Sequence, residues 1–90
     1  MKKYVVFYEA ADDMATKAPA AFPAHSEHIR QFRQQGSLLG IGTFADPQTE
    51  GSMAIFNSRE AAEKFASGDP MVVQGAVKRW VLREWQELAD

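Results

Sequence analysis

Cysteine is absent from this chain of 90 residues. Its absence excludes disulfide bonds, thiolate metal ligands and a cysteine nucleophile. No stretch approaches the roughly 20 consecutive apolar residues that a transmembrane helix needs, and no signal-peptide pattern is present, so we expect no membrane partner and a cytoplasmic location. No basic run is longer than Lys2-Lys3 or Lys78-Arg79, so we also expect no nucleic-acid partner.

The composition fits one small globular domain over residues 1–90. Hydrophobic residues make up 46% of the chain, and the formal net charge is −2. Six Phe, two Tyr and two Trp supply bulky side chains for a core. A chain of this length buries only about 60–65% of its unfolded surface, so its core is thin and association with a partner would stabilise it.

Four runs rich in β-branched and aromatic residues predict β-strands at residues 3–9, 37–44, 52–57 and 77–85. Successive side chains of a strand point to opposite faces. The first run therefore places Tyr4, Val6 and Tyr8 on one face and Val5 and Phe7 on the other. The last run alternates in the same way. Both faces of the predicted sheet are apolar, and both need a cover.

Apolar residues recur at steps of three and four around Pro23, which predicts an α-helix. Its apolar stripe consists of Phe22, His25, Ile29 and Phe32. Proline suits the first turn of a helix, where its missing N–H costs nothing, so we expect the helix to begin at Pro23. The residues before it, 10–21, are small and polar and contain a further proline. We expect them to form a loop, and whether that loop is ordered stays open.

Two Asp-Pro pairs lie later in the chain. Asp69-Pro70 follows a second predicted helix, which is capped at residue 57 or 58 and ends at Gly68. We expect Asp69 to cap a short helical segment that Gly75 closes. Asp46-Pro47 opens a loop rich in turn residues, and we interpret it as a turn without chemistry.

The predicted order β-α-β-β-α-β is typical of the ferredoxin-like α+β fold, an antiparallel sheet with two helices on one face. The sequence offers no further helix to cover the other face. An uncovered apolar sheet face of several hundred Å² promotes association. We therefore predict a homodimer that packs through its open sheet faces.

Two stretches of the chain resemble one known family. Residues 22–42, FPAHSEHIRQFRQQGSLLGIG, and residues 68–77, GDPMVVQGAV, are similar to the YciI (YCII-related) family. The most specific parts are Pro-Ala-His at 23–25, Gly-x-Leu-Leu at 36–39, and Asp-Pro at 69–70 followed by Gly75. The similarity extends through nearly the whole chain, and the ordered set is more specific than any one of its parts.

The resemblance implies the dimeric α/β-barrel form of the ferredoxin-like fold. It also implies a site made of a histidine early in the first helix and the aspartate of the Asp-Pro motif, which are His25 and Asp69 here. The chain departs from the family pattern at Phe22, where a basic residue is frequent, and at Met71, where an aromatic residue is frequent. The few activities suggested within the family include eliminations on chlorinated, hydroxylated aromatic rings, so the resemblance implies a candidate enzyme without a firm substrate.

His25 and Asp69 also fit roles that need no chemistry. A lone histidine on an apolar helix face is usually held by backbone groups in a core, and an aspartate before proline is a common helix cap. For Asp69 the two roles are compatible, because a capping carboxylate keeps a second oxygen that can accept from an imidazole N–H. An imidazole oriented in this way can transfer protons near neutral pH.

The second histidine, His28, lies at the margin of the apolar stripe, and we expect it to be solvated. A metal site at His25 and His28 lacks a third ligand, so we expect no metal and no cofactor. The serines lack the sequence context of a nucleophile. No glycine-rich phosphate loop precedes a predicted helix.

Five further residues are candidates for substrate binding. Tyr8 and Trp80 could line a pocket for an aromatic ligand, and Arg83 could meet an anionic group. Gly40 and Gly42 share one strand face, which a ligand or another backbone could approach closely. Each has a structural alternative, because aromatic residues are more often core or interface and arginines are more often solvated.

Three functions are compatible with the sequence. The first is a small cofactor-free acid–base enzyme of the lyase or isomerase type, in which His25 and Asp69 transfer a proton on a small, hydroxylated or aromatic molecule. The second is a module that binds such a ligand without changing it, and the third is a structural interaction domain. A hydrogen bond between the two side chains beside a cavity would favour the first two.

Overall fold

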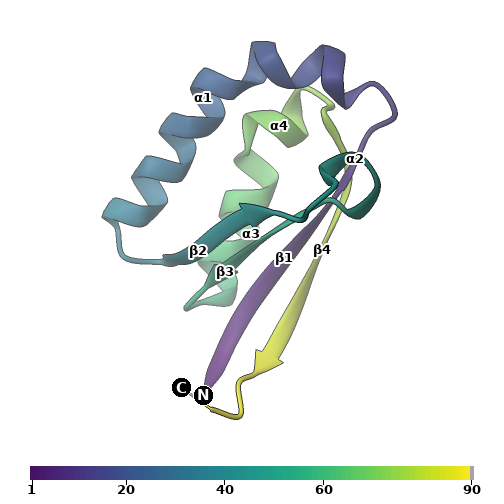
Figure 1. The fold of residues 1–90 in the computed structure, drawn as a ribbon. Helices are drawn as coiled ribbons and strands as arrows, with labels where there is room; N and C mark the ends of the chain where they lie inside the picture. The colour runs from purple at the N-terminus through teal and green to yellow at the C-terminus, as the bar shows by residue number, and fades with distance from the viewer. Residues whose placement is uncertain (90) are drawn as a thin grey trace.

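The computed structural model describes residues 1–89, and Asp90 lies outside this part of the chain. Figure 1 shows the strands and helices that these residues form. In order, they are β1 (Lys2–Ala10), α1 (Met14–Gln34), β2 (Leu38–Thr43), α2 (Pro47–Glu50), β3 (Ser52–Phe56), α3 (Arg59–Gly68), α4 (Pro70–Val73) and β4 (Val77–Gln86). Each strand agrees with its predicted range to within one residue at either end.

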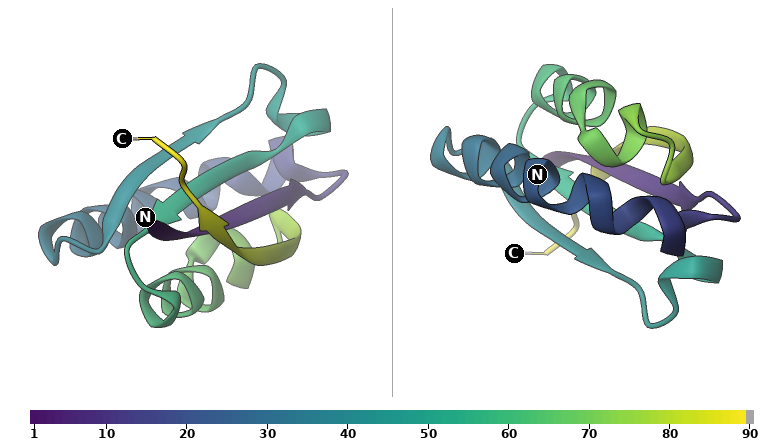
Figure 2. Two further views of the ribbon diagram at one scale, coloured as in Figure 1. Left: turned by 90° about the horizontal axis from the view of Figure 1, so that it is seen from below. Right: turned by 90° about the horizontal axis from the view of Figure 1, so that it is seen from above.

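The four strands form one antiparallel sheet in the order β2-β3-β1-β4. Tyr4 of the central strand β1 lies opposite Phe56 of β3 and Glu84 of β4. The helices cover one face: the sheet lies in front of them when seen from below, and α1 and α3 lie in front of the sheet when seen from above (Figure 2). The chain therefore has the predicted ferredoxin-like α+β fold, with α2 and α4 as short additions.

The core lies between this sheet face and the helices. Its buried members come from β1, β2, β3 and α3: Val6, Leu38, Ala54, Phe56, Ala62, Phe65 and Ala66. Tyr4, Tyr8, Trp80 and Leu82 pack against them, which confirms the predicted faces of the first and last strands. Burying a large apolar side chain contributes about 1.5–3 kcal/mol, so fully buried Phe56 and Phe65 are central to the stability of the fold.

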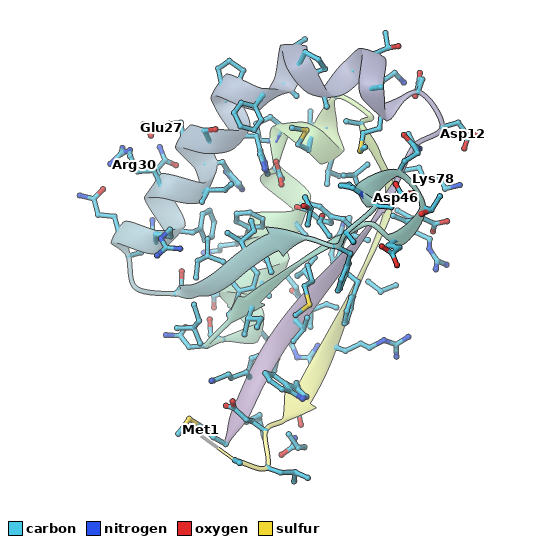
Figure 3. All side chains as sticks on the ribbon, in the orientation of Figure 1. Met1, Asp12, Glu27, Arg30, Asp46 and Lys78 are labelled. Atoms are coloured by element: carbon cyan, nitrogen blue, oxygen red, sulfur yellow. The ribbon has the colours of Figure 1, made fainter. Side chains whose placement is uncertain are left out.

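Helix α1 begins at Met14, so the prediction of a loop at residues 10–21 and of a helix start at Pro23 is wrong. The helix continues through Pro19 and Pro23, and both prolines lie on its exposed side. Water can bond there to the carbonyl groups that lose an N–H partner. Five alanines in the helix favour it intrinsically, and the buried Ala21 fixes it against the rest of the fold. Glu27 and Arg30 form an ion pair on the outer side of α1 (Figure 3).

Two further segments are more ordered than the sequence indicates. The loop that Asp46-Pro47 opens contains the four-residue helix α2. For residues 86–90, QELAD, which follow the predicted last strand, we expect a frayed tail, but Gln86 still belongs to β4. Within them Glu87 exchanges backbone hydrogen bonds of 2.9 Å with Met1 and forms an ion pair of 2.6 Å with Lys3. Pairing with the N-terminus therefore orders the first part of the tail.

The opposite face of the sheet has no helix over it within residues 1–89 (Figure 2). Strand alternation and register place an apolar set on this open face: Val5, Phe7, Met53, Ile55, Val81 and Trp85. Trp85 is exposed. The apolar open face that the sequence indicates is therefore present.

Candidate active site

Asp69 is the centre of the candidate site, and its side chain has no exposed surface. It lies between α3 and α4, where its carboxylate caps α4 by accepting a hydrogen bond of 3.0 Å from the backbone N–H of Met71 to Oδ1. Pro70 occupies the first turn of α4, as predicted. The Asp-Pro sequence thus forms this turn locally, and the packing of α3 and α4 brings the carboxylate into the interior.

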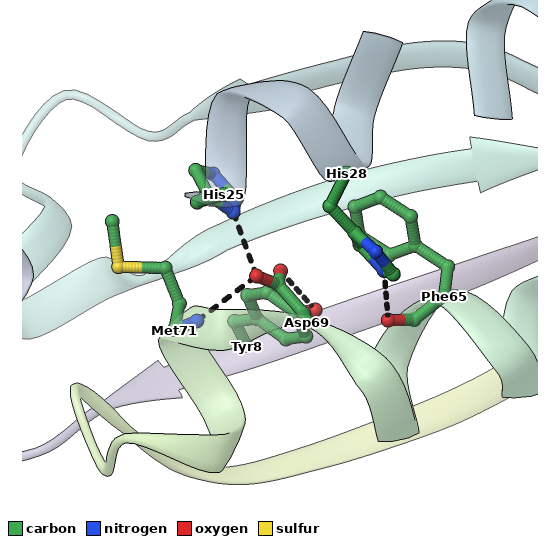
Figure 4. A network of polar contacts seen from close by, with 6 residues as sticks. All are labelled: Tyr8, His25, His28, Phe65, Asp69 and Met71. Atoms are coloured by element: carbon green, nitrogen blue, oxygen red, sulfur yellow. Dashed lines mark hydrogen bonds and ion pairs between the residues drawn. The ribbon is translucent and has the colours of Figure 1, made fainter. Parts of the chain in front are cut away.

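His25 reaches this carboxylate from α1. Its Nδ1 lies 2.7 Å from Asp69 Oδ1 (Figure 4). Because an ionised carboxylate can only accept, Nδ1 carries the hydrogen, and a neutral His25 has its lone pair on Nε2. Nε2 forms no hydrogen bond within the described residues, and 15% of the His25 side chain is exposed.

Tyr8 of β1 occupies the other oxygen of the carboxylate. Its hydroxyl donates a hydrogen bond of 2.7 Å to Asp69 Oδ2. Burial and the neighbouring negative charge raise the pKa of the Tyr8 phenol far above its usual range, so it stays a donor. Figure 4 shows Tyr8, His25 and Met71 converging on Asp69 from three elements.

The electrostatics of Asp69 are a balance between burial and hydrogen bonding. Burial opposes its ionisation, but the hydrogen bonds from His25, Tyr8 and the Met71 N–H outweigh burial and hold the pKa of Asp69 below its usual value. Asp69 is therefore ionised at neutral pH and can stabilise a positive charge on His25.

A cavity of about 450 Å³ lies beside this group. His25 and Tyr8 both line it. The rest of the lining is mostly apolar and includes the following residues from α1, the sheet and α4: Val6, Met14, Ala18, Phe22, Ile29, Ile41 and Met71. Small-molecule sites typically have volumes of about 300–1,000 Å³, so the cavity is large enough for a small ligand. A ligand in the cavity would therefore lie beside His25 and Tyr8.

The other candidate substrate-binding residues lie at different places. Gly42 lines the cavity and also a second hollow of about 300 Å³, whereas Gly40 lines the second hollow and not the cavity. Trp80 packs against the core, and Arg83 lies opposite Val5, with its side chain on the open face. The structure thus brings together His25, Asp69, Tyr8 and Gly42, and it does not bring Gly40, Trp80 or Arg83 to this cavity.

His28 is not solvated, so that prediction is wrong. Its ring packs between Phe32 and Phe65, with centroid distances of 4.9 and 4.8 Å, and its Nε2 lies 2.9 Å from the carbonyl oxygen of Phe65. This carbonyl belongs to the last turn of α3, where the helix itself supplies no donor. His28 therefore satisfies the end of α3 and holds α1 against it.

No metal site is formed by the residues that the structure describes: nowhere among them do three or more His, Asp or Glu side chains group around one point. His25 and His28 bond to different partners, so they do not share a ligand. Of the same residues, no helix is both long and apolar enough to cross a bilayer.

Sequence reasoning missed two features of the site. The bond between Tyr8 and Asp69 joins residues 61 positions apart, and no local pattern indicates it. Met14 and Ala18 line the cavity, but the prediction of a loop at residues 10–21 gave no indication of this. A signal for it exists, because Met14, Ala18, Phe22, His25 and Ile29 follow one another at helical steps of three and four.

The sequence of the chain is similar to one known protein family. The sequence profile of the YCII-related domain matches residues 2–86. The chain belongs to the YCII-related family. Its resemblance to that family, first indicated by the motifs around His25 and Asp69, is thereby confirmed. Among curated proteins, none matches the sequence.

Solved structures share the fold of this YCII-related chain at low sequence identity. One is 5-chloro-2-hydroxyhydroquinone dehydrochlorinase (TftG) from Burkholderia phenoliruptrix AC1100 in complex with 2,5-dihydroxybenzoquinone, with a TM-score of 0.65, 17% identity and 93% coverage of both chains. A second is an antibiotic biosynthesis monooxygenase, with a TM-score of 0.56, 12% identity and coverage of 99% of this chain and 100% of that one. A third is protein Atu4242 from Agrobacterium tumefaciens, with a TM-score of 0.58, 9% identity and coverage of 96% and 92%. At these identities the similarity establishes the ferredoxin-like fold alone.

Proposed function

We propose that this protein is a small acid–base enzyme in which His25 transfers a proton on a small molecule bound in the cavity and Asp69 orients His25. The observation that carries the proposal is the 2.7 Å bond between His25 Nδ1 and Asp69 Oδ1 at the wall of an apolar cavity. A base must be within hydrogen-bond reach of the proton that it removes. His25 lines the cavity and its Nε2 forms no hydrogen bond within the described residues, which supports this role.

The pair is suited to both halves of a proton transfer. Neutral His25 accepts a proton at Nε2, and the ionised Asp69 then stabilises the imidazolium at Nδ1. The same imidazolium can return the proton to another atom of the bound molecule. These two side chains therefore supply the proton transfers that an isomerisation or an elimination requires.

An elimination on a hydroxylated aromatic ring is the most specific form of the proposal. The cavity supplies apolar walls for a ring, and the similarly folded dehydrochlorinase acts on a chlorinated hydroxyhydroquinone. In such a reaction, one hydroxyl proton moves to the ring carbon that carries chlorine, a second is removed, and chloride leaves with the electron pair of the C–Cl bond. The product is the hydroxyquinone, and a residue that both takes and gives protons serves each step.

The test measures chloride release from 5-chloro-2-hydroxyhydroquinone under anaerobic conditions. We expect turnover by the wild type and a loss of about 100-fold or more in His25→Gln, the usual size of an acid–base contribution. Asp69→Asn should also lose activity. Asp46→Asn is the matched control, because Asp46 is also a helix cap before proline and does not line the cavity. Equal turnover by His25→Gln and the wild type would refute the proposed mechanism.

A ligand-binding module without catalysis is the second candidate, and the cavity itself supports it. In that case 2,5-dihydroxybenzoquinone should raise the melting temperature of the wild type, with no chloride released from the chlorinated compound. Binding without turnover would select this candidate over the enzyme.

We also propose that the protein is a homodimer through the open sheet face. Phe7, Ile55 and Val81 support this, because their side chains lie on a face that nothing covers within residues 1–89. Light scattering should give roughly twice the chain mass of 10.0 kDa. Val81→Lys should shift the protein to the monomer mass, whereas Glu63→Lys on the exposed side of α3 should not. A monomeric wild type would exclude the dimer.

A further inference from the structure

The hydroxyl of Tyr8 bonds to the oxygen of Asp69 that His25 does not contact. It lies 2.7 Å from Asp69 Oδ2, whereas His25 Nδ1 and the Met71 N–H both bond to Oδ1. Each oxygen of the buried carboxylate therefore has a donor. A carboxylate bonded through one oxygen alone can rotate about its Cβ–Cγ bond, and a donor on the second oxygen fixes its plane.

We infer that Tyr8 is a positioning residue: its hydroxyl fixes the plane of the Asp69 carboxylate, and the carboxylate in turn holds His25 in the tautomer with its hydrogen on Nδ1. The inference rests on the proposed function, because it assigns Tyr8 a role in the same acid–base group. Tyr8 thus has a role directed at Asp69 in addition to its place in the wall of the cavity.

Burial makes this hydrogen bond necessary. Asp69 has no exposed surface, so water cannot replace a lost donor at Oδ2. Within the described residues, Tyr8 is the only donor to Oδ2, and His25 and Tyr8 are the titratable groups that act on Asp69. Without the Tyr8 hydroxyl, the negative charge would be less stabilised, and the carboxylate would bind a proton more readily.

The backbone around Tyr8 is itself closely held. Gly51, which precedes β3, has a φ of +78°, and a Cβ added there would clash with the carbonyl oxygen of Tyr8. Tyr8 also lies opposite Ser52 of β3 and Trp80 of β4 in the sheet. Tyr8 therefore presents its hydroxyl from one of the two inner strands of the sheet, a rigid support for a positioning group.

Tyr4 provides a matched control. It lies on the same strand and the same face as Tyr8, and it packs against the same core. Its hydroxyl forms no hydrogen bond within residues 1–89. Tyr4→Phe and Tyr8→Phe thus remove the same atom from similar places, and only Tyr8→Phe removes a donor from Asp69.

The experiment uses nuclear magnetic resonance on the full chain and needs no substrate. The carboxyl ¹³C signal of Asp69 reports its pKa, and the ¹⁵N signals of His25 report its tautomer. His28 is the other histidine of the chain, and a His28→Gln sample assigns the signals. In Tyr8→Phe we expect the pKa of Asp69 to rise by about 0.5 or more and the His25 signals to move toward a mixture of tautomers. Tyr4→Phe should leave both unchanged.

A second measurement covers the case in which Tyr8→Phe does not fold. The chain has two tyrosines, so 3-fluorotyrosine added to the Tyr4→Phe protein labels Tyr8 alone. A fluorinated phenol is a stronger donor, and it should lower the pKa of Asp69 further. Unchanged Asp69 and His25 signals in both Tyr8 proteins would overturn the inference. Chloride release that depends on His25 would in that case still support the proposed function, so the two can fail separately.

Discussion

The two Asp-Pro pairs share one local structure but lie in opposite surroundings. Asp46 and Asp69 each cap a four-residue helix that begins with proline, and each accepts a hydrogen bond from the N–H two residues later, at 3.2 and 3.0 Å. Asp46 is exposed at the surface (Figure 3), whereas Asp69 is fully buried and accepts further hydrogen bonds from Tyr8 and His25. The motif alone determines the cap, and the surrounding elements determine whether the cap can also serve a site.

The positions of the two Asp-Pro pairs in the fold explain why Asp46 is exposed and Asp69 is buried. Asp46 lies in the connection between β2 and β3, where it is exposed. Asp69 directly follows α3, whose Phe65 and Ala66 are fully buried, and α1 crosses nearby. A polar group at such a place needs partners, because an unpaired buried carboxylate is costly. Tyr8 and His25 meet that need, and the resulting group borders the cavity.

The largest expected effect comes from removing the buried cap. Asp69→Ala leaves the Tyr8 hydroxyl, the His25 Nδ1–H and the Met71 N–H without their acceptor, and it should lower the free energy of unfolding by about 3 kcal/mol or more. Asp46→Ala removes an exposed cap alone and should cost about 1 kcal/mol. Urea denaturation of both variants at pH 7 measures the two values. Equal losses would mean that the partners of Asp69 add nothing to its role as a cap.

The fold could be predicted because its signals are local and consistent. The alternation in β1 and β4 indicates the faces of the sheet, and Ser58 caps α3 with its side chain, as expected. The start of α1 could not be predicted from the prolines, because proline is compatible with a helix interior when its side of the helix is exposed. The five alanines of α1, among them the buried Ala21, outweigh the usual preference of proline for the first turn.

The candidate site could be predicted only in part. His25 and Asp69 are marked by an apolar stripe, a capping motif and a family resemblance. Tyr8 was a candidate for ligand contact, since alternation in a strand gives the face of a side chain and not its partner. His28 looked solvated because a helical wheel shows its own helix alone, whereas Phe65 of α3 completes its surroundings. Contacts between distant elements are what the sequence leaves undetermined.

A smaller effect is expected from pH, because the contribution of Asp69 to the free energy of unfolding depends on it. Hydrogen bonds hold the pKa of Asp69 in the folded protein below its ordinary value of 3.8. The stabilisation is therefore complete above that value. Below it, the unfolded chain binds a proton first, so stability is lost as pH falls toward the folded pKa, by at most about 1.4 kcal/mol per pH unit. The stability difference between wild type and Asp69→Ala should be smaller at pH 3 than at pH 5, a range that lies below the ordinary pKa of a histidine side chain. Subtracting the stability of Asp69→Ala from that of the wild type cancels the effects of the other carboxylates, which titrate in both proteins. A difference that stays constant down to pH 3 would mean that the donors around Asp69 do not favour its charge, and the contrast between the two caps would then be one of packing alone.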